Sequence, residues 1–539
     1  MGVRTRCRRH DRDAQQASTR TPPQAPSHRS EYTGGGVRVY NQHVIQGAIV
    51  QRGAIRLAAA LVSSVLGACT LTAINPDSCA DSQECKGAFG IGSVCAADGF
   101  CSQPLTHPRC TRSWPAGLLD SPEDFGDTIV IGSLFGFDDH ADTLLAAELP
   151  LRQVAELGGL DGRPLGIIHC DTTAMAGDAL DDIEGAASAA GFLARAIGVP
   201  AIVGPRGSAR TQAVFEAVRE RDVLVISPSA TSPALTGIDA TDPSFETPGL
   251  LWRTVPPDTL QSEVIAADMI SRDVTRVAAM YQIGAYGDGL VGLFESRFLD
   301  RGGTVDRLPF ESGQFATMVA TTGAALAAGE IQEVLFVSSD LADYSGFLIA
   351  ASATDDLISA FSAPDVGIFL ADAAFNDMLL VETATRAAAL YPRIRGTRPA
   401  SAQGVLFNAF AAAYAAEFDV SADSSGFTPH SYDAAWLVLY GIARASFEEP
   451  SLGGLGIARG LRRVSSGDEI EILPTSWANA VEHFRSGASI NVQGASGPLD
   501  YDPDTEETTA PVSIWAITAA PEEPVGWTFV ELERIEPEG

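Results

Sequence analysis

Residues 201–235 read AIVGPRGSARTQAVFEAVRERDVLVISPSATSPAL, and this stretch decides the fold. It consists of an apolar β-branched run, a polar loop and a helix-length segment, followed by a second apolar run and a second polar loop. Strands separated by helices in this way form the βαβ units of a parallel sheet. Both loops carry small hydroxyl residues, namely Ser208, Thr211, Ser229, Thr231 and Ser232. Ligands bind just beyond the carboxyl ends of such strands, so we expect a site for a small carboxylate there.

The same alternation extends along most of the chain. Upstream, IVIGSLFG and LGIIHCD are expected to be buried strands, and downstream the pattern restarts with VTRVAAMYQ, GTVDRLPF, EVLFVSS and VGIFLAD. Residues 375–447 are alanine-rich and predicted to be mostly helical, and PVSIWAIT is predicted to be the final strand. A chain of 539 residues exceeds the size at which one hydrophobic core stops growing, so we expect two α/β lobes.

Composition and missing motifs narrow the function. The formal net charge of −32 argues against nucleic acid and anionic membrane surfaces as partners, because neither attracts an acidic protein. The sequence contains no H-E-x-x-H, G-x-S-x-G or G-K-[ST] motif. We therefore expect a protein that is not an enzyme, with no catalytic residues, no metal and no cofactor.

The amino-terminal region indicates export. Residues 1–50 are basic and are expected to be either an unstructured extension or a mis-assigned start. Residues 51–69 carry arginines, an apolar run and small residues, which is typical of a secretory signal. Leu66-Gly67-Ala68-Cys69 resembles the lipobox of bacterial lipoproteins, in which the cysteine is lipidated. We expect a lipid anchor at Cys69 as the sole membrane attachment, in the periplasm or cell envelope; the alternative is an ordinary signal peptide.

The remaining cysteines predict disulfides. They are Cys79, Cys85, Cys95, Cys101, Cys110 and Cys170. An even number in an oxidising compartment indicates up to three bridges, whose connectivity the sequence leaves open. The spacings lack the close pairs of zinc sites, so residues 70–118 are expected to form a disulfide-stapled stalk.

Six segments in a fixed order resemble type I periplasmic binding proteins, specifically the branched-chain amino-acid-binding (Leu/Ile/Val) group of ABC-transporter solute receptors. These segments are Glu156–Arg163 with LGIIHCD, VGPRGSARTQ, ISPSATSPALT, LWRTVPPDTLQ, Tyr286–Gly289 and Gly494–Asp502. The resemblance implies two doubly wound parallel-sheet lobes joined by crossing hinge segments. We expect lobe 1 at 125–252 plus 374–462, lobe 2 at 253–373 plus 463–520, and a tail at 521–539.

The resemblance also implies a ligand and its contacts. The ligand would be an amino acid or similar small polar molecule, held between the lobes for delivery to an ABC permease. Its carboxylate would meet Ser208, Ala230 and Thr231, and its ammonium group would meet Asp372 or Asp340. Tyr286 would line the pocket from lobe 2. The alternative role of the serines and aspartates is helix capping, for which both residue types are preferred. The alternative function of the protein is that of a sensor or envelope-scaffold lipoprotein without a transport partner.

Overall fold

The computed structural model describes residues 78–537, except 103–104, 176, 240–241, 401–403 and 423–424. The predicted basic extension, the signal segment with Cys69 and the start of the stalk (70–77) lie outside the described residues. No helix in the described part of the chain has the length and apolar character needed to cross a membrane.

The first lobe is built on a six-stranded sheet. Its order is β1 (Arg112–Trp114), β3 (Leu165–Asp171), β2 (Ile129–Phe135), β4 (Ala201–Val203), β5 (Leu224–Ser227) and β6 (Leu251–Arg253). All neighbours pair in parallel except β1, which is antiparallel to β3. The predicted strands IVIGSLFG and LGIIHCD are β2 and β3, so the parallel sheet expected from 201–235 is confirmed.

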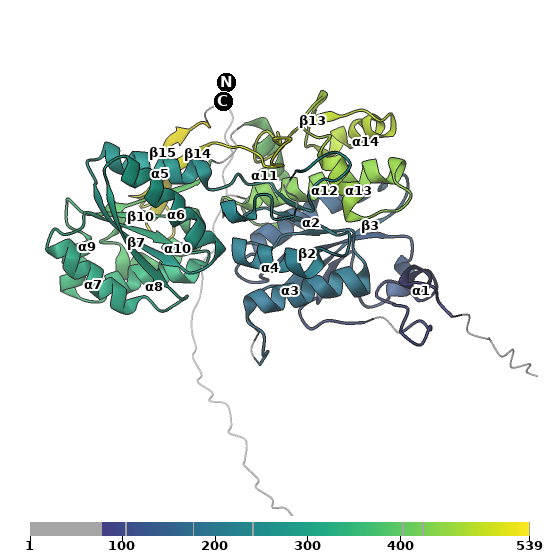
Figure 1. Cartoon of the computed structure of the whole chain (residues 1–539), viewed down its shortest axis with the longest axis horizontal. Coiled ribbons are helices and arrows are strands. Elements are labelled where there is room, and N and C mark those ends of the chain that lie inside the picture. The colour runs from purple at the N-terminus through teal and green to yellow at the C-terminus, as the bar shows by residue number, and fades with distance from the viewer. Residues whose placement is uncertain are drawn as a thin grey trace, which may run out of the picture. The chain divides into compact units, whose positions relative to one another are not determined.

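Successive strand residues of this sheet face opposite layers of helix. Ile131 and Ile167 pack with α2 (Ala141–Glu156) and α12 (Thr428–Glu448), while Val130 and Ile168 pack with α3 (Asp182–Phe192) and α4 (Ser208–Val218). This division follows from the two-residue period of a strand. Figure 1 shows α3 and α4 on one side of β2, and α2 and α12 on the other. The remaining elements of this lobe are α11 (Val405–Phe418), α13 (Gly454–Leu461), β12 (Asp468–Glu471), α14 (Trp477–Arg485) and β13 (Ile490–Gln493).

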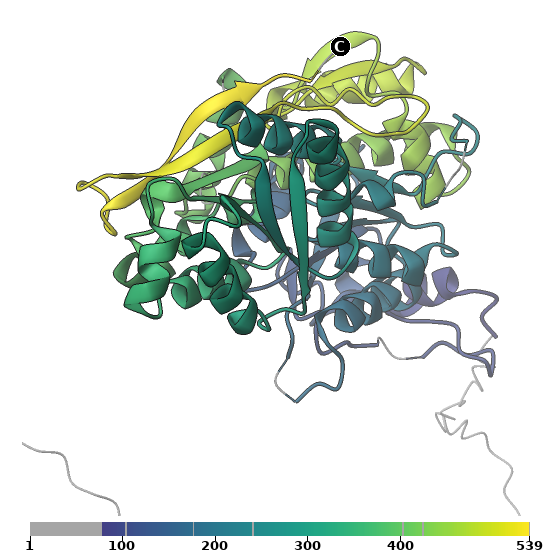
Figure 2. The ribbon, with the colours of Figure 1, turned by 60° about the vertical axis from the view of Figure 1, so that its left-hand side comes forward.

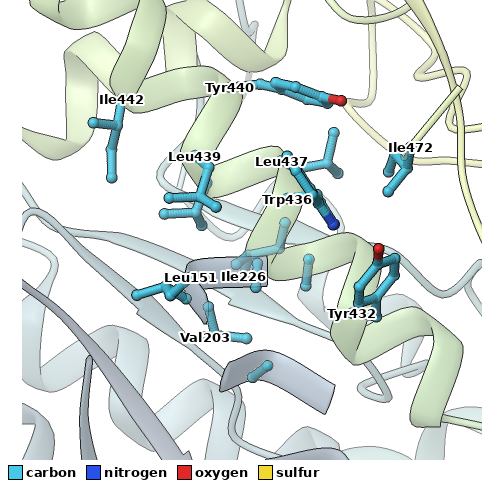
Figure 3. Close-up of a cluster of buried hydrophobic side chains, with 14 of the residues drawn as sticks. Leu151, Val203, Ile226, Tyr432, Trp436, Leu437, Leu439, Tyr440, Ile442 and Ile472 are labelled. Atoms are coloured by element: carbon cyan, nitrogen blue, oxygen red, sulfur yellow. The ribbon is translucent and has the colours of Figure 1, made fainter. Parts of the chain in front are cut away.

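Helix α12 lies at the centre of the larger core of this lobe. Its residues from Thr428 to Ala445 are all buried, because other elements cover it on every side. Figure 3 shows Trp436 and Leu439 of α12 above Val203 of the sheet, with Tyr440 further along the helix.

The second lobe is built on a seven-stranded sheet. Its order is β15 (Trp527–Ile535), β14 (Val512–Ala519), β11 (Ile394–Pro399), β10 (Gly367–Leu370), β9 (Glu333–Val337), β7 (Arg276–Gln282) and β8 (Thr304–Phe310). Strands β7 to β11 pair in parallel, and β14 is antiparallel to both β11 and β15. The helices are α5 (Thr259–Ser271), α6 (Ala285–Asp300), α7 (Ala316–Ala327), α8 (Leu341–Ala351), α9 (Asp355–Phe361) and α10 (Asp377–Ala387).

The chain returns from lobe 2 to lobe 1 later than the sequence predicts. We expected this crossing at 373/374, but α10 packs in the second lobe and β11 pairs with β10 and β14. The crossing therefore follows Pro399. Strand β11 reads IRGTRP. Its glycine, proline and arginines are not typical of a strand, so the sequence did not predict one here; pairing with β10 and β14 stabilises it.

The last crossing is also displaced. Residues 463–501 were assigned to lobe 2, yet β12, α14 and β13 pack against the core of lobe 1 through residues such as Trp477 and Val492. The predicted tail 521–539 contains β15, which pairs with β14 along its whole length. Figure 2 shows this β14–β15 hairpin in yellow. The structure thus joins the lobes by three segments: after β6, between β11 and α11, and between Tyr501 and β14.

The six cysteines of the described region all form disulfides. Cys79–Cys95 and Cys85–Cys101 close the small segment around α1 (Ser82–Phe89), and Cys110–Cys170 ties this segment to β3. The prediction of three bridges is confirmed, and the structure supplies their connectivity. The sulfurs of Cys79, Cys85 and Cys95 lie close together, but as disulfides they are not thiolate ligands.

Candidate ligand-binding site

Loops from both lobes enclose a small chamber of about 20 Å³ at the carboxyl ends of their parallel strands. Its walls are Arg206, Gly207, Ser208, Ser229 and Phe427 of lobe 1, and Tyr286, Ser339, Asp372 and Ala373 of lobe 2. A larger mouth of about 530 Å³ shares Gly207, Tyr286 and Ser339 with this chamber. The position matches the rule that ligands of open α/β sheets bind beyond the strand ends.

Arg206 supplies a buried positive charge to the chamber. The residue is 9 % exposed, and its Nη1 has no hydrogen-bond partner among the described residues. Its guanidinium carbon lies 5.0 Å from the ring centroid of Phe427. Burial lowers the pKa of Arg206, whereas the nearby carboxylates of Asp142, Asp139 and Asp372 raise it. An arginine stays protonated in proteins, so this buried cation attracts an anionic acceptor.

Two serines beside Arg206 are arranged as hydroxyl donors. Ser208 Oγ accepts from the backbone N–H of Ser232 at 3.1 Å, and Ser229 Oγ accepts from that of Gly207 at 3.3 Å. Because each oxygen already accepts, its O–H hydrogen can point toward an anion. Gly207 adopts a φ of 84°, a left-handed conformation that suits glycine, immediately before α4 begins at Ser208. Arg206, Ser208 and Ser229 together form a cradle for a carboxylate.

Ala230 and Thr231 lie outside the chamber lining. The Ala230 N–H donates to Ser227 Oγ at 3.1 Å, and its carbonyl accepts from Arg253 at 3.0 Å. Thr231 is 1 % exposed, and its carbonyl accepts from the backbone N–H of Asp258 at 2.8 Å. Direct contacts of these two residues with a carboxylate stay a prediction; in this conformation their backbone groups hold the loop through hydrogen bonds to Ser227, Arg253 and Asp258.

Lobe 2 contributes a buried carboxylate opposite Arg206. Asp372 follows β10 at the start of a short 3₁₀ turn (η4, Asp372–Ala374) and is 3 % exposed. The Tyr286 hydroxyl donates to Asp372 Oδ1, and so does the backbone N–H of Ala373 at 3.0 Å. Burial raises the pKa of Asp372, while Tyr286 and Gln261, which face the carboxylate, act in the opposite direction. Burial also raises the pKa of Tyr286 well above its ordinary value, so its hydroxyl stays a donor.

Asp340 lies at the mouth and joins the two lobes. Its carboxylate accepts from Arg210 of α4 at 3.0 Å and from Gln282 at the end of β7 at 2.9 Å. Arg210 also pairs with Asp182 of lobe 1. A further contact between the lobes runs from Ser232 Oγ to the carbonyl of Ala285 at 2.6 Å. The lobes therefore contact each other at the mouth. The Asp340 carboxylate already accepts hydrogen bonds from Arg210 and Gln282.

The predicted residues thus divide into two groups. Ser208, Tyr286 and Asp372 lie together at the chamber, whereas Ala230, Thr231 and Asp340 lie behind it or at the mouth. Sequence reasoning missed Arg206 and Phe427. Arg206 had a signal, since it is a charged residue in a loop of otherwise small residues. Phe427 had none, because a distant segment of the chain brings it to the site.

A family model described as "Receptor family ligand binding region" matches residues 145–519. Among curated proteins no sequence match was found. Solved structures resemble the chain at low identity. The leucine-binding protein LivK of Thermotoga maritima is 16% identical with a TM-score of 0.57, covering 76% of this chain and 99% of its own.

Two further structures extend this likeness. The branched-chain amino-acid-binding protein LivJ of Streptococcus pneumoniae, in complex with isoleucine, is 17% identical with a TM-score of 0.53, covering 75% of this chain and 100% of its own. A solute-binding protein of R. palustris in complex with 4-hydroxybenzoate is 15% identical with a TM-score of 0.57, covering 76% and 97%. The expected fold, the two-lobe type I periplasmic-binding-protein architecture, is confirmed.

Proposed function

Since this chain belongs to the family of receptor ligand-binding regions, we propose that it is an extracytoplasmic solute-binding lipoprotein. It clamps an amino acid, or a similar small polar ligand, between its lobes for an ABC transporter. One observation carries the proposal: Arg206 of lobe 1 and Asp372 of lobe 2 line the same buried chamber with opposite charges. A zwitterion is complementary to that arrangement.

Each charged group of such a ligand has defined partners. The carboxylate accepts from Arg206 and from the hydroxyls of Ser208 and Ser229. The ammonium group donates to Asp372, whose second partner, Tyr286, donates and so keeps the carboxylate an acceptor. The chamber is too small for an amino acid in the closed conformation, because about 20 Å³ corresponds to roughly one water. Binding therefore requires the lobes to open about the three connecting segments and to close again on the ligand.

A second candidate function is ligand sensing without transport. The family description refers to receptors, and it suits a lipoprotein whose closed form signals to a partner rather than feeding a permease. Both candidates use the same site and the same predicted anchor at Cys69. Uptake of the identified ligand by cells lacking the gene separates them, since only transport makes uptake depend on this protein.

Calorimetry on the full chain with amino acids and aromatic acids tests the binding role. We expect an α-amino acid to bind, and Arg206→Gln and Asp372→Asn to weaken it about 10- to 100-fold, because each removes a hydrogen bond to a charged group. The matched control is Arg219→Gln, an exposed arginine at the carboxyl-terminal cap of the helix that begins at Ser208. Absence of binding by every compound, or unchanged affinity in both site variants, would refute the proposal. An unmodified terminus by mass spectrometry would refute the anchor.

A further inference from the structure

The mouth outside the chamber is a cavity with an acidic lining. Its volume of about 530 Å³ lies within the range of roughly 300–1,000 Å³ found for small-molecule pockets. Its described lining includes one basic residue, Arg210, and four acidic residues, two from each lobe: Asp181, Asp182, Glu311 and Asp340. Four carboxylates and one guanidinium give the mouth a formal charge of −3. Each lobe thus contributes negative charge to the space between them.

Arg210 is shared between two of these carboxylates. Its Nε donates to Asp182 Oδ2 at 2.7 Å, and its Nη2 donates to Asp340 Oδ1 at 3.0 Å. The other oxygen of Asp340, Oδ2, accepts from the neutral amide of Gln282 at 2.9 Å. One positive charge therefore faces two negative charges at this point. Because each carboxylate oxygen has two lone pairs, Asp340 can accept from a further donor.

The other two carboxylates of the mouth receive hydrogen bonds from neutral groups. Asp181 Oδ1 accepts from the backbone N–H of Glu184 at 2.8 Å and so caps α3. Glu311 Oε2 accepts from the side-chain amide of Gln314 at 2.9 Å. These donors carry no positive charge, so the mouth keeps its excess of negative charge.

The mouth and the chamber are parts of one continuous site. Gly207, Tyr286 and Ser339 line both spaces, and Asp340 is the residue after Ser339. The acidic lining therefore starts one residue beyond the chamber wall, at a Cα spacing of about 3.8 Å. The side chain of a ligand whose α-groups lie in the chamber reaches the mouth directly.

An unpaired nitrogen of Arg206 points independently to a ligand in the chamber. Arg206 lines the chamber, is 9 % exposed, and its Nη1 has no hydrogen-bond partner among the described residues. Asp139, Asp142 and Asp372 act on Arg206 as neighbouring negative charges, yet none of them accepts from this nitrogen. A ligand carboxylate supplies the missing acceptor. The site thus has a place for one anionic group in the chamber and an excess of negative charge outside it.

We propose that the mouth is a side-chain subsite, and that the ligand is an α-amino acid whose side chain ends in a positive charge. The inference rests on the proposed function and names its ligand class. The α-carboxylate meets Arg206, and the α-ammonium group meets Asp372. The side-chain cation lies among the carboxylates of the mouth, where Asp340, which adjoins the chamber, accepts from it.

The charges of such a ligand complement those of the mouth. A cleft lined by one sign of charge concentrates ligands of the opposite sign. Isoleucine and 4-hydroxybenzoate are the ligands of two similar structures. Isoleucine brings no charge to the mouth, and 4-hydroxybenzoate brings no positive charge at all. The mouth therefore favours a dibasic amino acid such as lysine over both.

Calorimetry on the full chain with L-lysine and L-norleucine measures the subsite. Both compounds have the same α-groups and a four-carbon side chain, and lysine alone carries the terminal ammonium group, which is protonated at neutral pH. We expect lysine to bind about tenfold more tightly, because this group interacts with several partly exposed carboxylates. The ratio of the two affinities should fall as salt is added, since exposed charges are screened.

Two variants separate the subsite from lobe closure. Asp340→Asn and Arg210→Met break the same ion pair between the lobes, and a loss of closure affects both ligands alike and cancels in the lysine-to-norleucine ratio. Asp340→Asn removes a negative charge from the mouth and should lower this ratio about three- to fivefold. Arg210→Met removes the positive charge and should raise it by a similar factor. The matched control is Glu330→Gln, an exposed residue before β9 and so at the opposite end of the strands, which should leave the ratio unchanged.

The outcomes distinguish the subsite from the proposed function. A ratio near or below one in the wild type would overturn the subsite, and so would a ratio that Asp340→Asn and Arg210→Met leave unchanged or shift in the same direction. In each of these cases the binding of norleucine still supports the clamp. Absence of binding by lysine, norleucine and every other amino acid refutes the proposed function, and the subsite with it.

Discussion

His430 provides a quantitative test of how the first connecting segment is held. It lies in α12, is 2 % exposed, and its Nδ1 lies 2.8 Å from the carbonyl of Thr254, just after β6. In return the Thr254 hydroxyl donates to the His430 carbonyl at 2.9 Å. Burial lowers the pKa of His430 to about 4, although the Thr254 carbonyl favours the protonated form. The neutral ring thus donates from Nδ1 and fixes the segment on α12.

Proton linkage gives the sign and size of the contribution of His430 to the pH dependence of stability. The folded pKa of about 4 lies below the ordinary value of 6.5, so between these values the unfolded chain binds more protons than the folded one. Stability therefore rises with pH over this window and is constant above it. A shift of about 2.5 units corresponds to about 3 kcal/mol, lost as the pH falls from 6.5 to 4. The substitution His430→Asn keeps a donor near the Nδ1 position and removes the titration.

Denaturant unfolding at several pH values between 4 and 7.5 measures this term. The other carboxylates and histidines titrate in both proteins, so the quantity of interest is the difference in unfolding free energy between wild type and His430→Asn. We expect this difference to shift by about 3 kcal/mol toward the variant on acidification and to be flat above pH 6.5. A difference that does not vary with pH would refute the assignment of a neutral buried histidine at this position.

Three further predictions concern closure, the stalk and the core. Replacing Arg210 by Met, or Asp340 by Asn, removes a partly exposed ion pair worth up to about 1 kcal/mol, so calorimetry should show ligand affinity reduced up to about fivefold; unchanged affinity in both would contradict a closing role. The double variant Cys110→Ser/Cys170→Ser opens a loop of 60 residues and should lower the unfolding free energy by about 4 kcal/mol; an unaltered denaturation midpoint would contradict it. Trp436→Ala should cost about 3–5 kcal/mol in the same assay, because the side chain is fully buried in α12; a loss below about 1 kcal/mol would show that the core collapses around it.

Local patterns sufficed for much of the fold. The βαβ alternation in 201–235, the buried strands and the order of the family motifs predicted two parallel α/β lobes, and each depends on residues close together in sequence. The strands of lobe 2 that were missed are β11 and β15. In β11, glycine, proline and two arginines contradict strand propensity, and pairing with β10 and β14 decides its state. β15 reads WTFVELERI and pairs with β14 directly before it in the chain, so its residues favour the strand that was missed.

The residues of the candidate site also divide into those that local sequence predicted and those whose role depends on the tertiary structure. Ser208, Tyr286 and Asp372 were predictable, because each follows or begins an element whose end faces the cleft. Arg206 had a sequence signal as a charged residue among small ones, but its importance lies in a buried Nη1 that has no hydrogen-bond partner among the described residues, which is a property of the whole environment.

The sequence by itself determined the lobes, the cysteines available for disulfides and the loops that face the cleft, because spacing and hydrophobic period are local properties of a chain. Only the tertiary structure decided which loop groups remain available to a ligand. Internal hydrogen bonds engage the Ala230 backbone, and an ion pair engages Asp340, whereas Nη1 of Arg206 has no hydrogen-bond partner in the described part of the chain. Those pairings join residues far apart along the chain, and burial, which sets the cost of an unpaired charge, exists only once the lobes are packed.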